Sequence, residues 1–130
     1  QADIDNDGDI DLVISNNNDD ANLLINDGTP KNSWIGFQLQ GIVSNRQAIG
    51  SKIVIFTSLG TQVAWVNPSG SYLSSNDQRV IFGLGKEEKV KTVEIYWPGG
   101  DKKETFKDLD SNFYYKVLEG TSISIAQGKY

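Results

Sequence analysis

The sequence predicts an all-β chain, built as an antiparallel β-sandwich or a flattened barrel. Apolar and polar residues alternate along most of the 130 residues, which is the period of a half-buried strand. Short clusters of Gly, Pro, Asn and Asp, such as 26–28 and 98–101, interrupt this alternation and are typical of tight turns. No stretch has a helical period of useful length. These three observations predict many short strands joined by turns.

Two of the expected strands precede a change of composition at residues 27–33, DGTPKNS, and eight follow it. The first two lie among Asn and Asp residues and are too short to bury a core alone, because two strands are only marginally stable in water. We therefore place a boundary there, with a fragment at 1–31 and a β domain at 32–130. The predicted strands are Asp11–Ser15, Asn22–Asn26, Trp34–Gln40, Lys52–Thr57, Gln62–Asn67, Arg79–Phe82, Lys91–Trp97, Lys103–Lys107, Tyr114–Leu118 and Ser122–Ala126.

The overall composition limits the classes of partner. Hydrophobic residues make up 38% of the chain, enough for a packed core, and the net charge of −5 argues against a nucleic-acid partner. No apolar run is long enough to cross a bilayer, so no transmembrane segment is expected. Because the sequence begins with Gln1 and contains no methionine, we interpret it as an internal piece of a longer protein.

The sequence does not favour an enzyme. It contains no histidine and no cysteine, which excludes the usual serine and cysteine triads and any thiolate metal site. No S-x-x-K motif is present either. A glycosidase needs a matched pair of carboxylates, and nothing in the pattern selects a pair among the glutamates. We therefore predict a non-enzymatic protein.

The strongest local signal is DIDNDGDID at residues 3–11, where five carboxylates alternate with other residues. One like-charge pair at about 4 Å costs roughly 4 kcal/mol at an effective dielectric near 20, so a folded loop of this kind needs a cation. Calcium fits, because it takes several oxygen ligands at flexible distances, whereas an EF-hand is excluded by Ile14 at the twelfth loop position. The alternative is an acidic Asx-rich turn without a metal. The predicted ligands are the side chains of Asp3, Asp5, Asp7 and Asp11 with the carbonyl of Asp9, turned by Gly8.

The same stretch carries a family resemblance. The pattern D-x-D-x-D-G-x-x-D followed by a strand resembles the calcium loops of integrin-type β-propeller blades, and DLVISN…ANLLINDG resembles the FG-GAP or VCBS repeat that contains them. The resemblance implies that residues 1–31 are the end of a propeller repeat, so that this part is a remnant of a β-propeller blade. The rest of that propeller would then be a partner of this segment.

A second resemblance covers the β domain. Three separated blocks occur in order: NRQAIG at 45–50, then SYLSSND at 71–77 with FGLG at 82–85, and then WPGG at 97–100. This series resembles the ASPIC/UnbV domain. It implies an extracellular or cell-envelope binding module at the end of a calcium-stabilised propeller, with a protein or a glycan at the cell surface as its partner.

Four residues of the β domain are candidates for ligand binding. Tyr72 lies in a long loop, and with Trp65 and Tyr96 it could stack on sugar rings, so a carbohydrate-binding module is the alternative function. Tyr72 could equally close the end of the sandwich. Arg46 could meet a ligand or pair with Asp77, and we favour the pair. Trp97 shares strand parity with apolar neighbours and is expected in the core.

Overall fold

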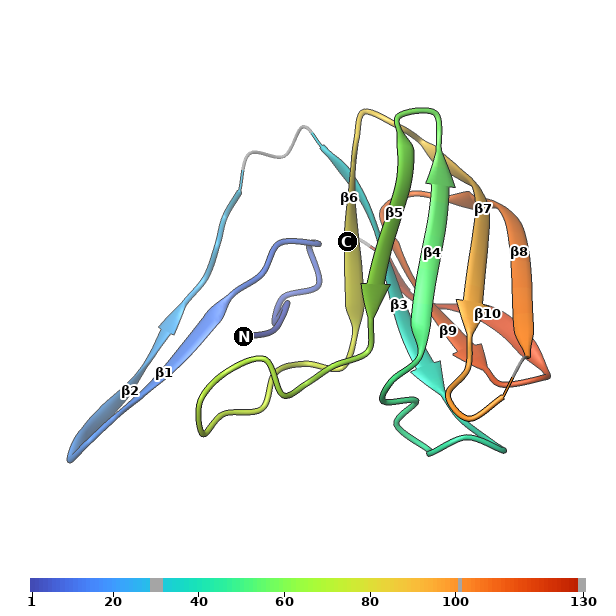
Figure 1. Ribbon diagram of the computed structural model, residues 1–130. Coiled ribbons are helices and arrows are strands. Elements are labelled where there is room, and N and C mark those ends of the chain that lie inside the picture. The colour runs from blue at the N-terminus through green and yellow to red at the C-terminus, as the bar shows by residue number, and fades with distance from the viewer. Residues whose placement is uncertain (29–31, 101, 129–130) are drawn as a thin grey trace.

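The computed structural model describes residues 1–28, 32–100 and 102–128, and these residues form an all-β fold, as predicted (Figure 1). Side-chain positions are described through residue 126. In these ranges, no helix is long and apolar enough to span a membrane. The strands are β1 (Leu12–Asn16), β2 (Asp19–Leu24), β3 (Ser33–Gln40), β4 (Lys52–Thr57), β5 (Gly60–Trp65), β6 (Val80–Gly85), β7 (Lys89–Tyr96), β8 (Lys103–Asp110), β9 (Phe113–Leu118) and β10 (Ser122–Gly128).

Eight of these strands form the two layers of a sandwich. One sheet has the order β10-β9-β3-β6 and the other the order β5-β4-β7-β8, and each sheet keeps its own edge strands. The sandwich alternative is therefore confirmed over the barrel. The pairing within the sandwich is antiparallel except at one place, where β3 and β9 run parallel. Parallel neighbours need a long crossover connection. Here all four strands of the second sheet lie between β3 and β9 in the sequence.

The core lies between the inner faces of the two sheets, where alternate residues point inward. Trp97 is buried there, which confirms the parity argument. The sandwich core consists of Ile35, Phe37, Leu39, Ala48, Ile53, Ile55, Val66, Val80, Phe82, Leu84, Val90, Val93, Ile95, Trp97, Tyr115 and Val117.

Strands β1 and β2 form a separate antiparallel hairpin that projects from the sandwich (Figure 1). Strand β2 begins at Asp19 rather than at the predicted Asn22, because the chain reverses tightly after β1 with Asn18 at a φ of 62°. Asn tolerates this left-handed conformation better than most residues. Every residue of both strands is exposed, including the apolar ones.

Candidate functional site

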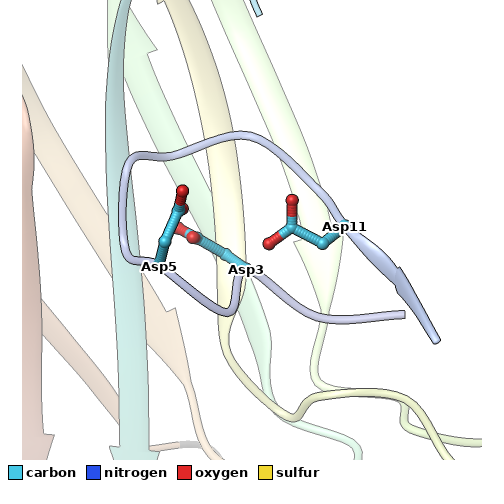
Figure 2. A group of neighbouring side chains, drawn as sticks. All are labelled: Asp3, Asp5 and Asp11. Carbon is cyan, nitrogen blue, oxygen red and sulfur yellow. The ribbon is translucent and has the colours of Figure 1, made fainter. Parts of the chain in front are cut away.

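The acidic stretch folds into a loop that turns three carboxylates toward one another. Asp3, Asp5 and Asp11 each offer an oxygen within 4.8 Å of the others. Figure 2 shows the Asp3 and Asp5 side chains together, with the Asp11 carboxylate facing them across the loop. The backbone bridge between Ala2 and Asp11 closes the loop, and a φ of 97° at Gly8 lets it curl. Asp3 and Asp11 are each only 1% exposed, whereas Asp5 is open to solvent.

The two buried carboxylates are held by the loop backbone. Asp3 accepts from the N–H groups of Asp7 (3.1 Å) and Gly8 (2.9 Å). Asp11 accepts from the N–H of Ile4 (2.7 Å) through one oxygen and from that of Asn26 (2.8 Å) through the other. An ionised carboxylate has about four acceptor sites, so both side chains keep lone pairs for a further partner.

This donor set fits a hard divalent cation. It consists of oxygens alone, and calcium prefers carboxylate and carbonyl oxygens in an irregular shell. Partial desolvation, followed by repulsion from Asp7 and then from Asp11 and Asp3, raises the pKa of Asp5 above its ordinary value. A cation would relieve that repulsion. The Asp7 carboxylate instead accepts from the N–H of Asp9 (2.9 Å) and lies outside the close group of three. That group consists of side-chain oxygens, so the Asp9 carbonyl stays a predicted ligand.

The loop is docked on the outer face of the β10-β9-β3-β6 sheet. The Tyr114 hydroxyl on β9 donates to the Asp3 carboxylate at 2.5 Å. Gly8 lies directly against the Trp34 indole on β3, since a Cβ added there would come within 2.3 Å of the ring. The Trp34 and Tyr114 rings contact each other with centroids 4.8 Å apart. The proposed ligand Asp3 is therefore also part of the contact with the sandwich.

Arg79, just before β6, also holds the acidic loop against the sheet. Its guanidinium donates to the Asn6 side chain at 2.6 Å and to the Asp3 carbonyl, and it lies 4.5 Å from the Tyr114 ring centroid. It also forms an ion pair with Asp77 at 2.5 Å. Asp77 therefore pairs with Arg79 and not with Arg46, the partner that the sequence favoured. Asp77 and Arg79 are only two residues apart, so their pairing does not depend on the position of a distant loop. This explains why Asp77 pairs with Arg79 rather than with Arg46.

The aromatic candidates lie at different places. Trp65 and Tyr96 both pair with Lys52 across the β5-β4-β7-β8 sheet and so share its outer face. Trp65 is 57% exposed, but the Lys52 ammonium lies 4.1 Å from the Tyr96 ring centroid and shields that ring. Tyr72 is highly exposed in the loop that follows β5. Arg46 is exposed and lines a cavity of about 470 Å³.

The sequence reasoning did not identify Trp34, Tyr114 and Arg79 as residues of the site. The strand pattern places Trp34 and Gly36 on one face of β3 and Tyr114 on the matching face of β9, but it says nothing about what covers that face. A signal was present in Gly36, because a Cβ there would come within 2.2 Å of the Tyr114 ring. A glycine inside a strand often marks such a close approach.

The fold and the loop together define a two-sheet β-sandwich module with an attached acidic loop that fits a divalent cation. The family described as "ASPIC and UnbV" matches residues 41–124, and the chain belongs to this family. The chain is also similar to human cartilage acidic protein 1, with 31% identity over 126 residues. That alignment covers 91% of this chain but 18% of the human protein, so the chain spans less than a fifth of its relative's length.

Proposed function

We propose that this chain is a non-enzymatic, extracytoplasmic binding module attached to the end of a calcium-stabilised β-propeller. The observation that carries the proposal is the β1–β2 hairpin, which is apolar on both faces and exposed on both, beside an acidic loop docked on the sandwich. Large exposed apolar patches on soluble proteins usually mark contact surfaces.

The two faces of the hairpin follow from its register. Leu12 is paired with Leu24, and these side chains lie on one face. Val13 is paired with Leu23 on the opposite face. A strand pair with apolar residues on both faces needs cover on both sides, as a propeller blade receives from its neighbours. The resemblance of this segment to an FG-GAP or VCBS repeat supplies such neighbours.

Calcium bound by Asp3, Asp5 and Asp11 would neutralise the crowded carboxylates and hold the loop closed. The loop connects directly to β1 and is joined to the sandwich through Asp3 and Tyr114. A cation there would therefore fix the hairpin relative to the sandwich as a structural clamp. Magnesium should substitute poorly, because it requires a small, strict octahedron and keeps much of its water.

The family and the named relative support the setting of the proposal. The chain belongs to the ASPIC and UnbV family, and its relative is named for cartilage. The proposed location is outside the cytoplasm or in the cell envelope, and the proposed partners are the propeller and a cell-surface protein or glycan.

The test is calcium titration of the 130-residue chain by calorimetry, combined with thermal unfolding in calcium, magnesium or chelator. At free calcium about 100 times Kd, binding stabilises by about 2.7 kcal/mol. This should raise the unfolding temperature by roughly 5–15 °C, with a smaller shift in magnesium. Asp5→Asn should abolish the calcium shift without lowering the stability of the calcium-free protein, because Asp5 is exposed.

The matched control is Asp20→Asn, which removes the same charge from an exposed position of the hairpin outside the group of three. It should keep the full calcium response. Equal calcium responses for the Asp5 and Asp20 variants, or no response in the unchanged chain, would refute the calcium clamp.

A further inference from the structure

A polar cavity of about 470 Å³ lies on the sandwich beside the docked acidic loop. Its volume falls within the range of about 300–1,000 Å³ that is typical of small-ligand sites. The floor comes from the outward-facing Gln38 and Gln40 of β3 and from Lys116 of β9, which is paired with Gln38. Two loop segments, 46–47 and 76–79, form the walls.

The wall at 76–79 is fixed by the acidic loop and not by a ligand. The Arg79 guanidinium is occupied by Asp77, by the Asn6 side chain and by the Asp3 carbonyl. The Asp77 N–H donates to the Gln1 carbonyl at 3.0 Å. These contacts hold the wall in place before any ligand arrives, which lowers the cost of binding.

Two other cations line the cavity and are open to solvent. The ion pairs among the described residues are Arg79–Asp77, Lys89–Asp110 and Lys103–Glu94, so neither Arg46 nor Lys116 takes part in one. Both side chains are exposed, although the chain as a whole carries a net charge of −5. An arginine fork and a lysine together favour an oxyanion, such as a carboxylate.

The rest of the lining is rich in amides. Gln38, Gln40, Gln47, Asn76 and Gln78 can each donate and accept, which suits hydroxyl groups. The apolar member of the lining is Leu39, which is buried in the core. A protein partner would normally need exposed aromatic or aliphatic anchors at the centre of its contact, and this lining offers none.

We propose that this cavity binds an acidic saccharide, with its carboxylate on Arg46 and Lys116 and its hydroxyls on the surrounding amides. This inference rests on the proposed role of the chain as a binding module and names the ligand class for one site. The saccharide is a sugar acid of the uronate type, in which a ring carries one carboxylate among several hydroxyl groups.

The probe is tetragalacturonate, titrated into the 130-residue chain by NMR and calorimetry at about 50 mM salt, where charge pairs are weakly screened. The backbone and side-chain amide signals of Gln38, Gln40 and Gln47 should shift. The doubly substituted Arg46→Gln, Lys116→Gln chain should bind about tenfold more weakly or worse. Arg46→Lys keeps the charge but loses the fork and should lie in between.

The control is the doubly substituted Lys91→Gln, Lys107→Gln chain, which removes two exposed lysines from the other sheet. It should change affinity by less than about twofold, since those charges lie outside the cavity. Fully methyl-esterified tetragalacturonate tests the carboxylate and should bind far more weakly. Equal weakening in the two double variants, or equal binding of the ester, would overturn the proposal.

A tetraglutamate peptide separates the two sources of carboxylate. If it binds as well as tetragalacturonate and shifts the same signals, the cavity is a site for acidic peptides and the saccharide assignment is wrong. The calcium titration is performed on the same samples. If the chain binds the saccharide but shows no calcium response, only the calcium clamp is refuted. If the chain responds to calcium but does not bind the saccharide, only this inference is refuted.

Discussion

The outer faces of the two sheets both present aromatic side chains, but they differ in burial. Only the face of the β10-β9-β3-β6 sheet is covered by another segment of the chain. On the β10-β9-β3-β6 sheet, Trp34 is 5% exposed and Tyr114 is 1% exposed, beneath the acidic loop. On the β5-β4-β7-β8 sheet, Trp65 stays 57% exposed and lies in a row with Lys52 and Tyr96. Both faces arise from the same alternation along their strands.

The difference teaches that burial on an outer face is decided by a distant segment. The loop that covers Trp34 and Tyr114 begins near residue 2, and its key contact joins residues 111 positions apart. The covering segment is also the one that gathers Asp3, Asp5 and Asp11. The stability of the covered face should therefore be coupled to the proposed binding of a cation by the loop.

The largest expected difference comes from removing the tryptophan of each face. Trp34→Ala should reduce the free energy of unfolding by about 3–5 kcal/mol, since it removes a buried ring from between the loop and the sheet. Trp65→Ala should cost about 0.5 kcal/mol or less, because that ring is mostly in water. Urea unfolding followed by circular dichroism measures both.

Equal losses for the two tryptophan variants would show that the faces are equivalent and that the loop does not cover Trp34 in solution. If Trp34→Ala is too unstable to purify, Trp34→Phe provides the milder version. It keeps a ring against Gly8 and should cost less than the alanine, while still exceeding Trp65→Ala.

A smaller effect tests the link between the loop and the covered face. Tyr114→Phe removes the hydroxyl that donates to the buried Asp3 carboxylate and should cost about 1.5–3 kcal/mol, the range for a hydrogen bond to a charged group. Tyr115→Phe is the matched control, because its hydroxyl donates to a neutral carbonyl of Asp110 at 3.1 Å. That variant should lose only about 1 kcal/mol in the same urea experiment.

If both tyrosine variants lose the same free energy of unfolding, the hydrogen bond to the Asp3 carboxylate is no stronger than the one to the Asp110 carbonyl. Calcium sharpens the test, because Asp3 is also a proposed ligand. Tyr114→Phe should weaken the calcium response as well as the stability, whereas Tyr115→Phe should leave the calcium response unchanged.

The fold could be predicted well because its signals are local. Alternation and turn residues located all ten strands, with shifts at the ends, such as β2 starting at Asp19. The parallel pairing of β3 with β9 could not be seen, since it depends on how the chain returns after the second sheet. Antiparallel neighbours are the commoner outcome, and the expectation followed that preference.

The acidic loop was predictable only in part. The spacing of the aspartates indicated a candidate cation loop, and the structure brings Asp3, Asp5 and Asp11 together. The sequence could not show that Asp3 would also accept from Tyr114, or that Arg79 would hold Asp77 and leave Arg46 in a cavity. The Tyr114–Asp3 contact joins segments 111 positions apart, which local spacing does not encode, whereas the Arg79–Asp77 pair is local and was missed because the expectation paired Asp77 with Arg46.

The smallest expected effect concerns Glu119, which directly follows β9. Its buried carboxylate accepts from three successive N–H groups, those of Ile42 (2.8 Å), Val43 (2.9 Å) and Ser44 (2.8 Å). Such a row of N–H groups is a concave anion site. Although desolvation opposes it, these hydrogen bonds lower the pKa of Glu119 below its ordinary value of 4.5. The anchored segment leads directly to Arg46 and Gln47 in the cavity wall.

Because the folded-state pKa of Glu119 is lowered, its contribution to stability is full above about pH 4.5 and is lost as the pH falls through that lowered value. Glu119→Gln should therefore cost about 1–2 kcal/mol near pH 7, and the gap from the unchanged chain should narrow in acid. Glu87→Gln, at a more exposed turn carboxylate that accepts from Ser58 and Leu59, should produce a smaller gap. Urea unfolding midpoints of these variants and of the unchanged chain, measured from pH 7 to below pH 4.5, test this prediction. A gap that stays constant below pH 4.5 would show that the ionised carboxylate does not hold this segment.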